Sequence, residues 1–284
     1  MAVLTMDVLA GVLRFTGATA LLGRHRHALP QPDQLCGPFW AWLAVAALTG
    51  EDPPDLSAFA VAAGTAVWPH DLPSARPVGE PSRTDAWTGV SRAADVESAG
   101  TSAPGVGAAV ERLSSGAVAA VPATGVWTPD RLLTLLEGLH DRGRPAVPVA
   151  NLSTGLLWGS RPTRDQIDHY LQTGDFTLGP SADWRVGHFT ALCGTLPGDR
   201  GTLVAVADTY PGLGDQGLHL QPVENLATAL ARGHPRTGGV LLAVPAADRE
   251  AVRDLVLEAH LEPAWWDNGT PFQGGWPPGT APPR

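Results

Sequence analysis

The 284-residue chain contains no lysine, so all 19 of its basic Lys and Arg side chains are arginines. This absence excludes chemistry that needs a lysine amine, such as Schiff-base formation or the phosphate contact of a P-loop. The usage of Ala, Gly, Pro and Arg is typical of a GC-rich genome and needs no functional explanation.

Cysteine is equally scarce, with Cys36 and Cys193 the only two in the chain. Two cysteines provide no disulfide framework, and we therefore expect a cytoplasmic protein. The first 22 residues are apolar in patches, but they carry Asp7 and Arg14 and lack the basic start of a signal peptide. No apolar run approaches the length that spans a bilayer, so we expect no membrane partner.

Acidic or basic blocks are also missing, although the formal net charge is −9. Without an arginine cluster that could follow a phosphate backbone, we expect no nucleic-acid partner. Apolar residues make up 44% of the chain and charged residues 17%, which indicates a globular protein with a sizeable core. The 33 glycines and 27 prolines predict many turns.

The first half of the sequence is predicted to be mainly helical. A polar hinge is expected at 24–27, and a long irregular segment rich in Gly, Pro and Ser at 68–100. Apolar spacing and terminal signals predict helices at 7–22, 38–48, 55–63, 101–114 and 131–140.

The second half is predicted to form a sheet, with strands at 117–121, 146–152, 189–196 and 203–208. Helices are expected at 163–172 and 222–232, followed by an additional strand–helix–strand unit over 240–266. We therefore predict an α+β fold with a mainly antiparallel sheet. It would form one domain over 1–272, with an insertion near 68–100 and a flexible tail over 273–284.

Four polar residues stand out by their order along the chain. Gln31 precedes Cys36-Gly-Pro at the start of an apolar helix, His188 follows Gly187 at the start of a strand, and Asp208 ends the next strand. A thiol nucleophile needs an oxyanion donor, a base and a group that orients the base, and these residue types supply all of them.

The segment from Gln31 to Ala41, with Cys36-Gly37-Pro38, resembles the nucleophile segment of papain-like cysteine peptidases. It is most similar to the branch that contains bacteriocin leader peptidases, in which Gly-His opens a strand and an Asp turn ends the next strand. The resemblance implies a papain-like fold in which Cys36 is the nucleophile, His188 the base, Asp208 the orienting group and Gln31 the oxyanion donor.

The sequence departs from this branch in ways that leave alternatives open. Gln31 lies five residues before Cys36, whereas the family usually has about six, so Gln34 is a second candidate for the oxyanion hole. Thr209 follows Asp208 where the family often has Pro. Trp184, four residues before His188, is a candidate for the wall of the substrate site, and Trp40 and Gln34 are further candidates for substrate contacts.

The expected positions suit thiolate chemistry. A helix N-terminus carries partial positive charge and unpaired N–H groups, which favour an anionic sulfur at Cys36. A carboxylate on the neighbouring strand would fix the tautomer of His188. Strand alternation turns Cys193 to the opposite face, where we expect a core residue. His25 and His27 are better explained by surface polarity than by metal binding, so neither metal nor cofactor is predicted.

These observations predict thiol-dependent acyl transfer on a peptide or amide-containing substrate, with hydrolysis favoured, in a setting such as peptide or natural-product maturation. The same residues would also serve an acyltransferase or cyclase. A third alternative is a non-catalytic pseudo-peptidase that binds a peptide or protein partner. The sequence leaves the oligomeric state open.

Overall fold

The computed structural model describes residues 6–233 and 236–271 and has a seven-stranded sheet at its centre. Every neighbouring pair of strands in this sheet is antiparallel. The strand order is β4-β9-β5-β6-β7-β8. In addition, β1 pairs with Gly194 and Thr195 in the C-terminal part of β6. The strands are β1 (Leu13–Arg14), β4 (Val118–Ala123), β5 (Val147–Ser153), β6 (Gly187–Pro197), β7 (Thr202–Ala207), β8 (Leu218–Pro222) and β9 (Gly239–Pro245).

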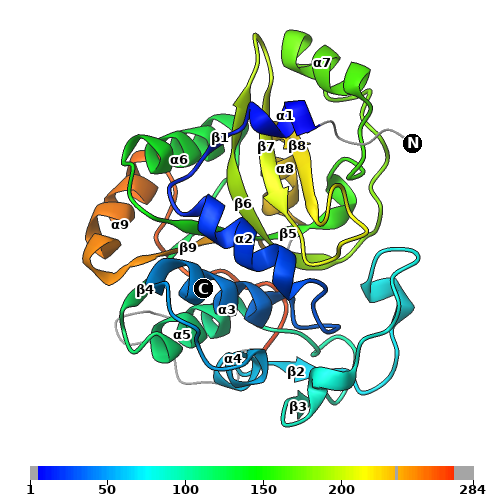
Figure 1. The fold of residues 1–284 in the computed structure, drawn as a ribbon, viewed down its shortest axis with the longest axis vertical. Coiled ribbons are helices and arrows are strands. Elements are labelled where there is room, and N and C mark those ends of the chain that lie inside the picture. The colour runs from blue at the N-terminus through cyan, green and yellow to red at the C-terminus, as the bar shows by residue number, and fades with distance from the viewer. Residues whose placement is uncertain (1–5, 234–235, 272–284) are drawn as a thin grey trace.

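Helices cover the sheet in two groups. One group centres on α3, which contacts β6 as well as α2, α4 and α5, and the other consists of α6, α8 and α9. Figure 1 shows α2 and α3 in front of the sheet and α8 behind it. The helices are α1 (Met6–Ala10), α2 (Ala18–Ala28), α3 (Cys36–Thr49), α4 (Leu56–Ala62), α5 (Ala103–Leu113), α6 (Pro129–Asp141), α7 (Arg164–Thr173), α8 (Val223–Ala231) and α9 (Arg249–Glu258).

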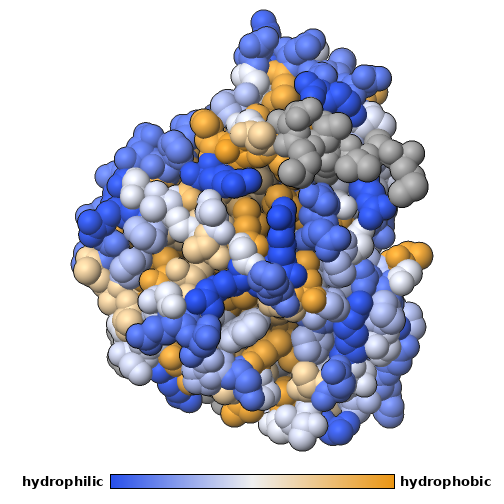
Figure 2. Space-filling model, viewed as in Figure 1, coloured by the Kyte–Doolittle hydropathy of each residue, from blue (hydrophilic) through white to orange (hydrophobic). Residues whose placement is uncertain are grey.

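Continuous burial explains why the central strands read as apolar runs in the sequence. All six residues of β4 are buried, as are the first six residues of β5. A strand with helices on both faces has no solvent side and therefore no alternation of polar and apolar residues. The outer face seen in Figure 2 is mostly hydrophilic, with hydrophobic residues visible between the polar ones.

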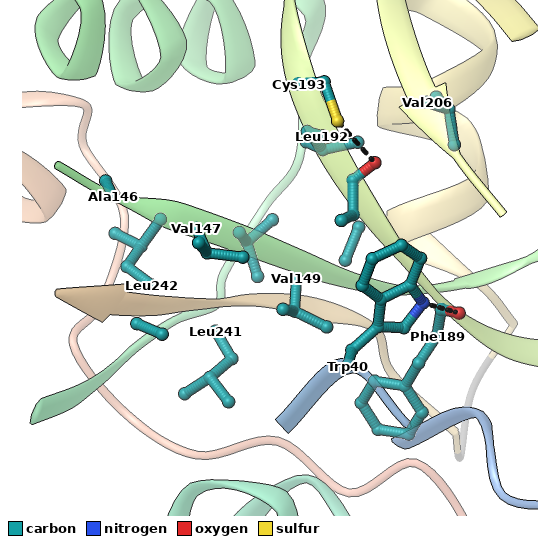
Figure 3. Packing of buried hydrophobic residues seen from close by; sticks show 14 of the residues in the cluster. Trp40, Ala146, Val147, Val149, Phe189, Leu192, Cys193, Val206, Leu241 and Leu242 are labelled. Carbon is teal, nitrogen blue, oxygen red and sulfur yellow. Dashed lines mark hydrogen bonds between the residues drawn. The ribbon is translucent and has the colours of Figure 1, made fainter. Parts of the chain in front are cut away.

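Helix α3 is held against β6 by Trp40. Its indole Nε1 donates a hydrogen bond of 2.9 Å to the carbonyl oxygen of Phe189, and the ring stacks on His25 of α2 at 5.3 Å. Figure 3 shows Trp40 reaching from α3 to the strand that carries Phe189. Trp40 is fully buried, so the expectation that it contacts substrate is wrong, and its role is to fix the helix on the sheet.

The N-terminal region differs from its prediction. A single helix over 7–22 is wrong, because α1 ends at Ala10 and the short strand β1 separates it from α2. The predicted hinge at 24–27 lies inside α2 instead. Its polar residues were compatible with a helix because His25 turns inward and is 1% exposed, while Arg26 and His27 face outward.

The C-terminal strand–helix–strand unit is not an addition to the sheet. β9 lies between β4 and β5, and the residues near 263–266 form no strand, only a bridge between Thr124 and Glu262. Strand β8 was missed, because the sequence was interpreted as a loop up to Pro222. The predicted tail over 273–284 lies outside the described residues.

The segment 68–100 is irregular, as predicted, apart from the two-residue strand β3 (Ser91–Arg92) and two short 3-10 turns. It is fixed to the residues just before Cys36. The carboxylate of Asp33 accepts the Arg83 N–H at 3.0 Å, and its carbonyl accepts the Trp87 indole N–H at 2.9 Å. Asp33 does not cap α3, because Leu35 is the residue before that helix and no side chain caps it.

Within residues 6–233 and 236–271, no helix is both long and apolar enough to cross a bilayer.

The contact between Trp40 and Phe189 generates a stability prediction. We expect Trp40→Phe to lower the free energy of unfolding by about 1–3 kcal/mol, because a buried carbonyl loses its donor and the ring loses contact area. Chemical denaturation measures the change. Val61→Ala, at an exposed position of α4, is the control, and an equal effect of both substitutions would contradict the anchoring role.

Candidate functional site

Cys36 is the first residue of α3 and is partly exposed. Because no side chain caps this helix, its first-turn N–H groups stay available to an anion. Gly37 allows the helix start to pack tightly, since a Cβ there would lie 2.8 Å from Val106 and 3.2 Å from Thr101. The Cys-Gly-Pro sequence thus places the sulfur at the positive end of the helix dipole.

His188 and Asp208 lie on the neighbouring strands β6 and β7, as the sequence indicated. His188 is the second residue of β6, and Asp208 directly follows β7. The imidazole Nε2 lies 3.1 Å from Asp208 Oδ1, and both side chains are almost fully buried. Since Nε2 is taken by the carboxylate, Nδ1 is the ring nitrogen left to face Cys36.

Cys36 and His188 are close enough for each to shift the pKa of the other. Burial alone would raise the pKa of the Cys36 thiol, but the charge of His188 and a hydrogen bond to it lower that pKa overall. Backbone N–H groups of Phe189 and Gly37 contribute to the lowering. The structure therefore brings the three predicted groups together in one charge-coupled row.

The same coupling acts on the other two groups. Burial opposes the charged form of His188, but Asp208 and the Cys36 thiolate outweigh burial and raise its pKa to about 10. Asp208 is also buried, yet the charge of His188 and hydrogen bonds from His188 and His219 hold its pKa well below its usual range. The arrangement favours a thiolate, an imidazolium and a carboxylate near neutral pH.

Two further histidines contact Asp208. The expectation that His25 lies on the surface is wrong, because it is 1% exposed, and His219 was not among the predicted site residues. His219 on β8 places Nε2 3.8 Å from Asp208 Oδ2. The Gln221 amide donates to His219 Nδ1 at 3.0 Å, which leaves the proton on Nε2, facing the carboxylate. His25 Nε2 lies 2.6 Å from the Asp208 carbonyl oxygen. The alternation Leu-His-Leu-Gln over 218–221 was the signal for an inward polar face.

The two glutamine candidates are separated by their hydrogen bonds. Gln34 is bonded at both ends of its amide to the backbone of Trp68, with distances of 3.1 and 2.7 Å, and therefore has a structural role. Gln31 is 2% exposed, and its Nε2 lies 3.3 Å from the Tyr210 hydroxyl, while its Oε1 has no protein partner within the described chain. Of the two, only Gln31 has a side-chain amide atom without a protein partner within the described chain.

Trp184 and Cys193, the remaining residues singled out in the sequence, have different surroundings. Trp184 contacts His188 edge-on, with ring centres 4.8 Å apart, and also contacts Tyr210. Cys193 lies at a bulge of β6 and is 1% exposed, and burial raises the pKa of its thiol to about 12. Figure 3 shows it among core side chains.

A cavity of about 350 Å³ opens at Cys36. Besides Cys36, five segments far apart in the sequence form its walls: the end of the irregular segment, β5, the start of β6, the residues after α8 and the turn near 269. The lining residues include Glu97, Asn151, Gly187, Arg232, Arg236 and Thr270. Cys36 therefore borders a space that a small ligand or a peptide segment can enter.

The chain matches the model of a family of unknown function, DUF6885, over residues 15–267, and it belongs to that family. All four residues of the candidate site lie within the matched range. No curated protein and no solved structure matches the chain. Family membership therefore assigns no activity, and a functional argument has to start from the site itself.

The coupling between Cys36 and His188 generates a prediction about pH. We expect iodoacetamide to alkylate Cys36 well below the pH of about 8.5 at which a free thiol titrates. His188→Ala removes the charge that lowers the thiol pKa, so the midpoint of the rate–pH curve should move upward by about one unit or more. Mass spectrometry of the labelled peptide measures the rate at Cys36.

Cys193→Ala is the control for this measurement and should leave the curve unchanged. A midpoint that stays in place in His188→Ala would show that the imidazole does not activate the sulfur.

Proposed function

We propose that the protein catalyses thiol-dependent acyl transfer, and that its reaction is hydrolysis of a peptide or amide bond. Cys36 would be the nucleophile, His188 the general base and acid, and Asp208 the residue that orients His188. The observation that carries the proposal is the row Cys36–His188–Asp208, in which Cys36 borders a cavity and the Asp208 carboxylate is buried.

The burial of Asp208 favours catalysis over a role in stability alone. A buried carboxylate costs free energy unless it is paired and hydrogen-bonded. Here it is bonded to His188, and the Thr209 N–H donates to it at 2.6 Å. A core position would be more stable with apolar residues, whereas a charged imidazole next to a partly exposed thiol is what nucleophilic catalysis requires.

The reaction would follow from these positions. The Cys36 thiolate attacks the carbonyl carbon, a carbon–sulfur bond forms, and the carbonyl oxygen takes up negative charge. His188 gives its proton to the leaving amine as the carbon–nitrogen bond breaks, which leaves a thioester on Cys36. Water then attacks the thioester, and His188 takes a proton from that water. The carbon–sulfur bond breaks, which regenerates the Cys36 thiolate and releases the carboxylic acid.

Gln31 is the side-chain donor that we assign to the oxyanion. Its backbone N–H donates to the Thr209 carbonyl at 3.1 Å, so its position is tied to the loop that follows Asp208. If its amide turns by 180°, Oε1 accepts from the Tyr210 hydroxyl and the NH₂ group becomes free for a ligand. The second donor would be the backbone N–H of Cys36 itself.

A papain-like fold is the architecture that we propose for this site. The support is a helix that begins with the nucleophile and packs on an antiparallel sheet, whose neighbouring strands carry the base and the orienting carboxylate. Hydrolysis and transfer to an amine share every step up to the thioester. The choice between them depends on which acceptor enters the cavity.

The proposal is tested with p-nitrophenyl acetate, an activated acyl donor. We expect a burst of p-nitrophenolate and a transient acetyl thioester on Cys36, both absent in Cys36→Ala, because the sulfur forms the covalent bond. Cys193→Ala is the matched control and should keep the burst. Added glycinamide that yields acetylglycinamide would identify a transferase. The absence of both burst and adduct in the wild type would indicate a non-catalytic binding protein.

The oxyanion assignment is tested by comparing Gln31→Ala with Gln34→Ala. We expect Gln31→Ala to slow acylation by about 100-fold without changing the alkylation rate of Cys36, because the amide acts only on the developing negative charge. Gln34→Ala should lose stability but keep the acylation rate within a fewfold of the wild type. The reverse order of effects would contradict the assignment.

A further inference from the structure

The cavity at Cys36 continues into a second cavity of about 450 Å³. The two share part of their walls, and the shared residues are Val186, Gly187, Arg232 and Arg236. Arg185 lines the second cavity as well. The space at Cys36 is therefore bordered by two arginines, Arg232 and Arg236, and the adjoining space by a third, none of which the proposed reaction uses.

Arg232 is directed into this space by the backbone. It directly follows α8 and has a φ of +47°, a conformation that a non-glycine residue adopts only at a cost. Its Nη2 lies against Gly187, where a Cβ would approach to 2.2 Å. Glycine before His188 is thus required by the guanidinium that occupies its side-chain position.

Arg232 is also connected to the catalytic strand. Its Nη1 donates to Asn151 Oδ1 at 3.1 Å, and the Asn151 amide donates to the His188 carbonyl at 3.3 Å. Asn151 is 2% exposed, so this connection is shielded from solvent. The guanidinium is therefore held next to the base by a fixed set of contacts.

The positive charge at this place is not balanced. Within the described residues, neither Arg232 nor Arg236 forms an ion pair. Burial and repulsion from Arg236 lower the pKa of Arg232, and Asp267 offsets this only in part. Glu97 is the one acidic residue among the described residues that line the two cavities. Two nearby guanidinium groups without a carboxylate partner leave room for an anionic ligand.

We propose that Arg232 and Arg236 form a carboxylate-binding subsite beside Cys36, which selects acyl substrates that carry a negative charge close to the bond that is cleaved. The proposal rests on the proposed function, because it places the substrate's carboxylate in relation to the thiol. The carboxylate would come either from an acidic side chain or from a free C-terminus, and Thr270 supplies an additional polar group at the same wall.

The test uses two alkylating agents that differ in charge, iodoacetate and iodoacetamide. The ratio of their rates at Cys36 reports the local field, whereas the iodoacetamide rate alone reports thiol reactivity. We expect this ratio to fall by about fivefold or more in Arg232→Gln and in Arg236→Gln, because each substitution removes one positive charge near the sulfur. Arg232→Lys retains the charge and should keep most of the ratio.

Arg253→Gln is the matched control, since Arg253 lies on α9 and lines neither cavity. Arg236 is exposed, so its substitution leaves the fold intact if Arg232→Gln does not. An unchanged ratio in both variants would overturn the subsite. A reduced ratio in the variants, together with no acetyl thioester from p-nitrophenyl acetate in the wild type, would support the subsite but contradict the proposed reaction. Failure of the subsite and failure of the proposed function therefore give different results.

The source of the carboxylate is determined by protection of Cys36 from iodoacetamide. Three capped peptides are compared: acetyl-Ala-Glu-Ala amide, acetyl-Ala-Gln-Ala amide and acetyl-Ala-Gln-Ala with a free carboxylate. We expect one or both charged peptides to protect at about tenfold lower concentration than the neutral peptide, and Arg232→Gln to abolish the difference. Equal protection by all three in the wild type would contradict the subsite.

Discussion

The structure depends on the contact between the start of α3 and the start of β6. Gly37 packs close to the Phe189 ring, the Trp40 indole donates to the Phe189 carbonyl, and Cys36 lies next to His188. A buried helix brings the positive end of its dipole to a strand that carries a basic ring. The fold therefore creates the conditions for a thiolate before any ligand is bound.

Asp208 extends this contact to the rest of the sheet. Its carboxylate is paired with His188 and faces His219, and its backbone carbonyl oxygen accepts a hydrogen bond from His25. A buried negative charge surrounded by three imidazole rings is tolerable because each ring can direct an N–H group toward an oxygen. The same residue thus supports the base and connects α2, β6 and β8.

Much of the framework could be predicted from the sequence. Strands β5, β6 and β7 consist mainly of apolar residues, and α3 has the length and composition of a buried helix, so local patterns are sufficient. The position of β9 between β4 and β5 could not be predicted, because it depends on pairing between distant segments. Strand β8 was missed because His219 and Gln221 are polar residues that face inward to serve Asp208.

The candidate site divides in a similar way. Cys36, His188 and Asp208 were found through residue order and a family resemblance, and the choice between Gln31 and Gln34 needed hydrogen bonds that no spacing reveals. Gln34 adopts a positive φ and binds the backbone of Trp68. Arg232 carried no signal in the sequence, since its importance comes from a backbone turn after α8 and from the space left by Gly187.

The short loop after β7 has a consequence for how this protein can vary. Within three consecutive positions it supplies the carboxylate for His188, the Thr209 carbonyl that holds the Gln31 backbone, and the Tyr210 hydroxyl that contacts the Gln31 amide. Lengthening this loop by one residue would displace the base and the oxyanion donor together. Diversification without loss of chemistry is therefore expected in the irregular segment 68–100, whose outer turns can be exchanged while Gln34 holds its start at Trp68 and Asp33 holds its middle at Arg83.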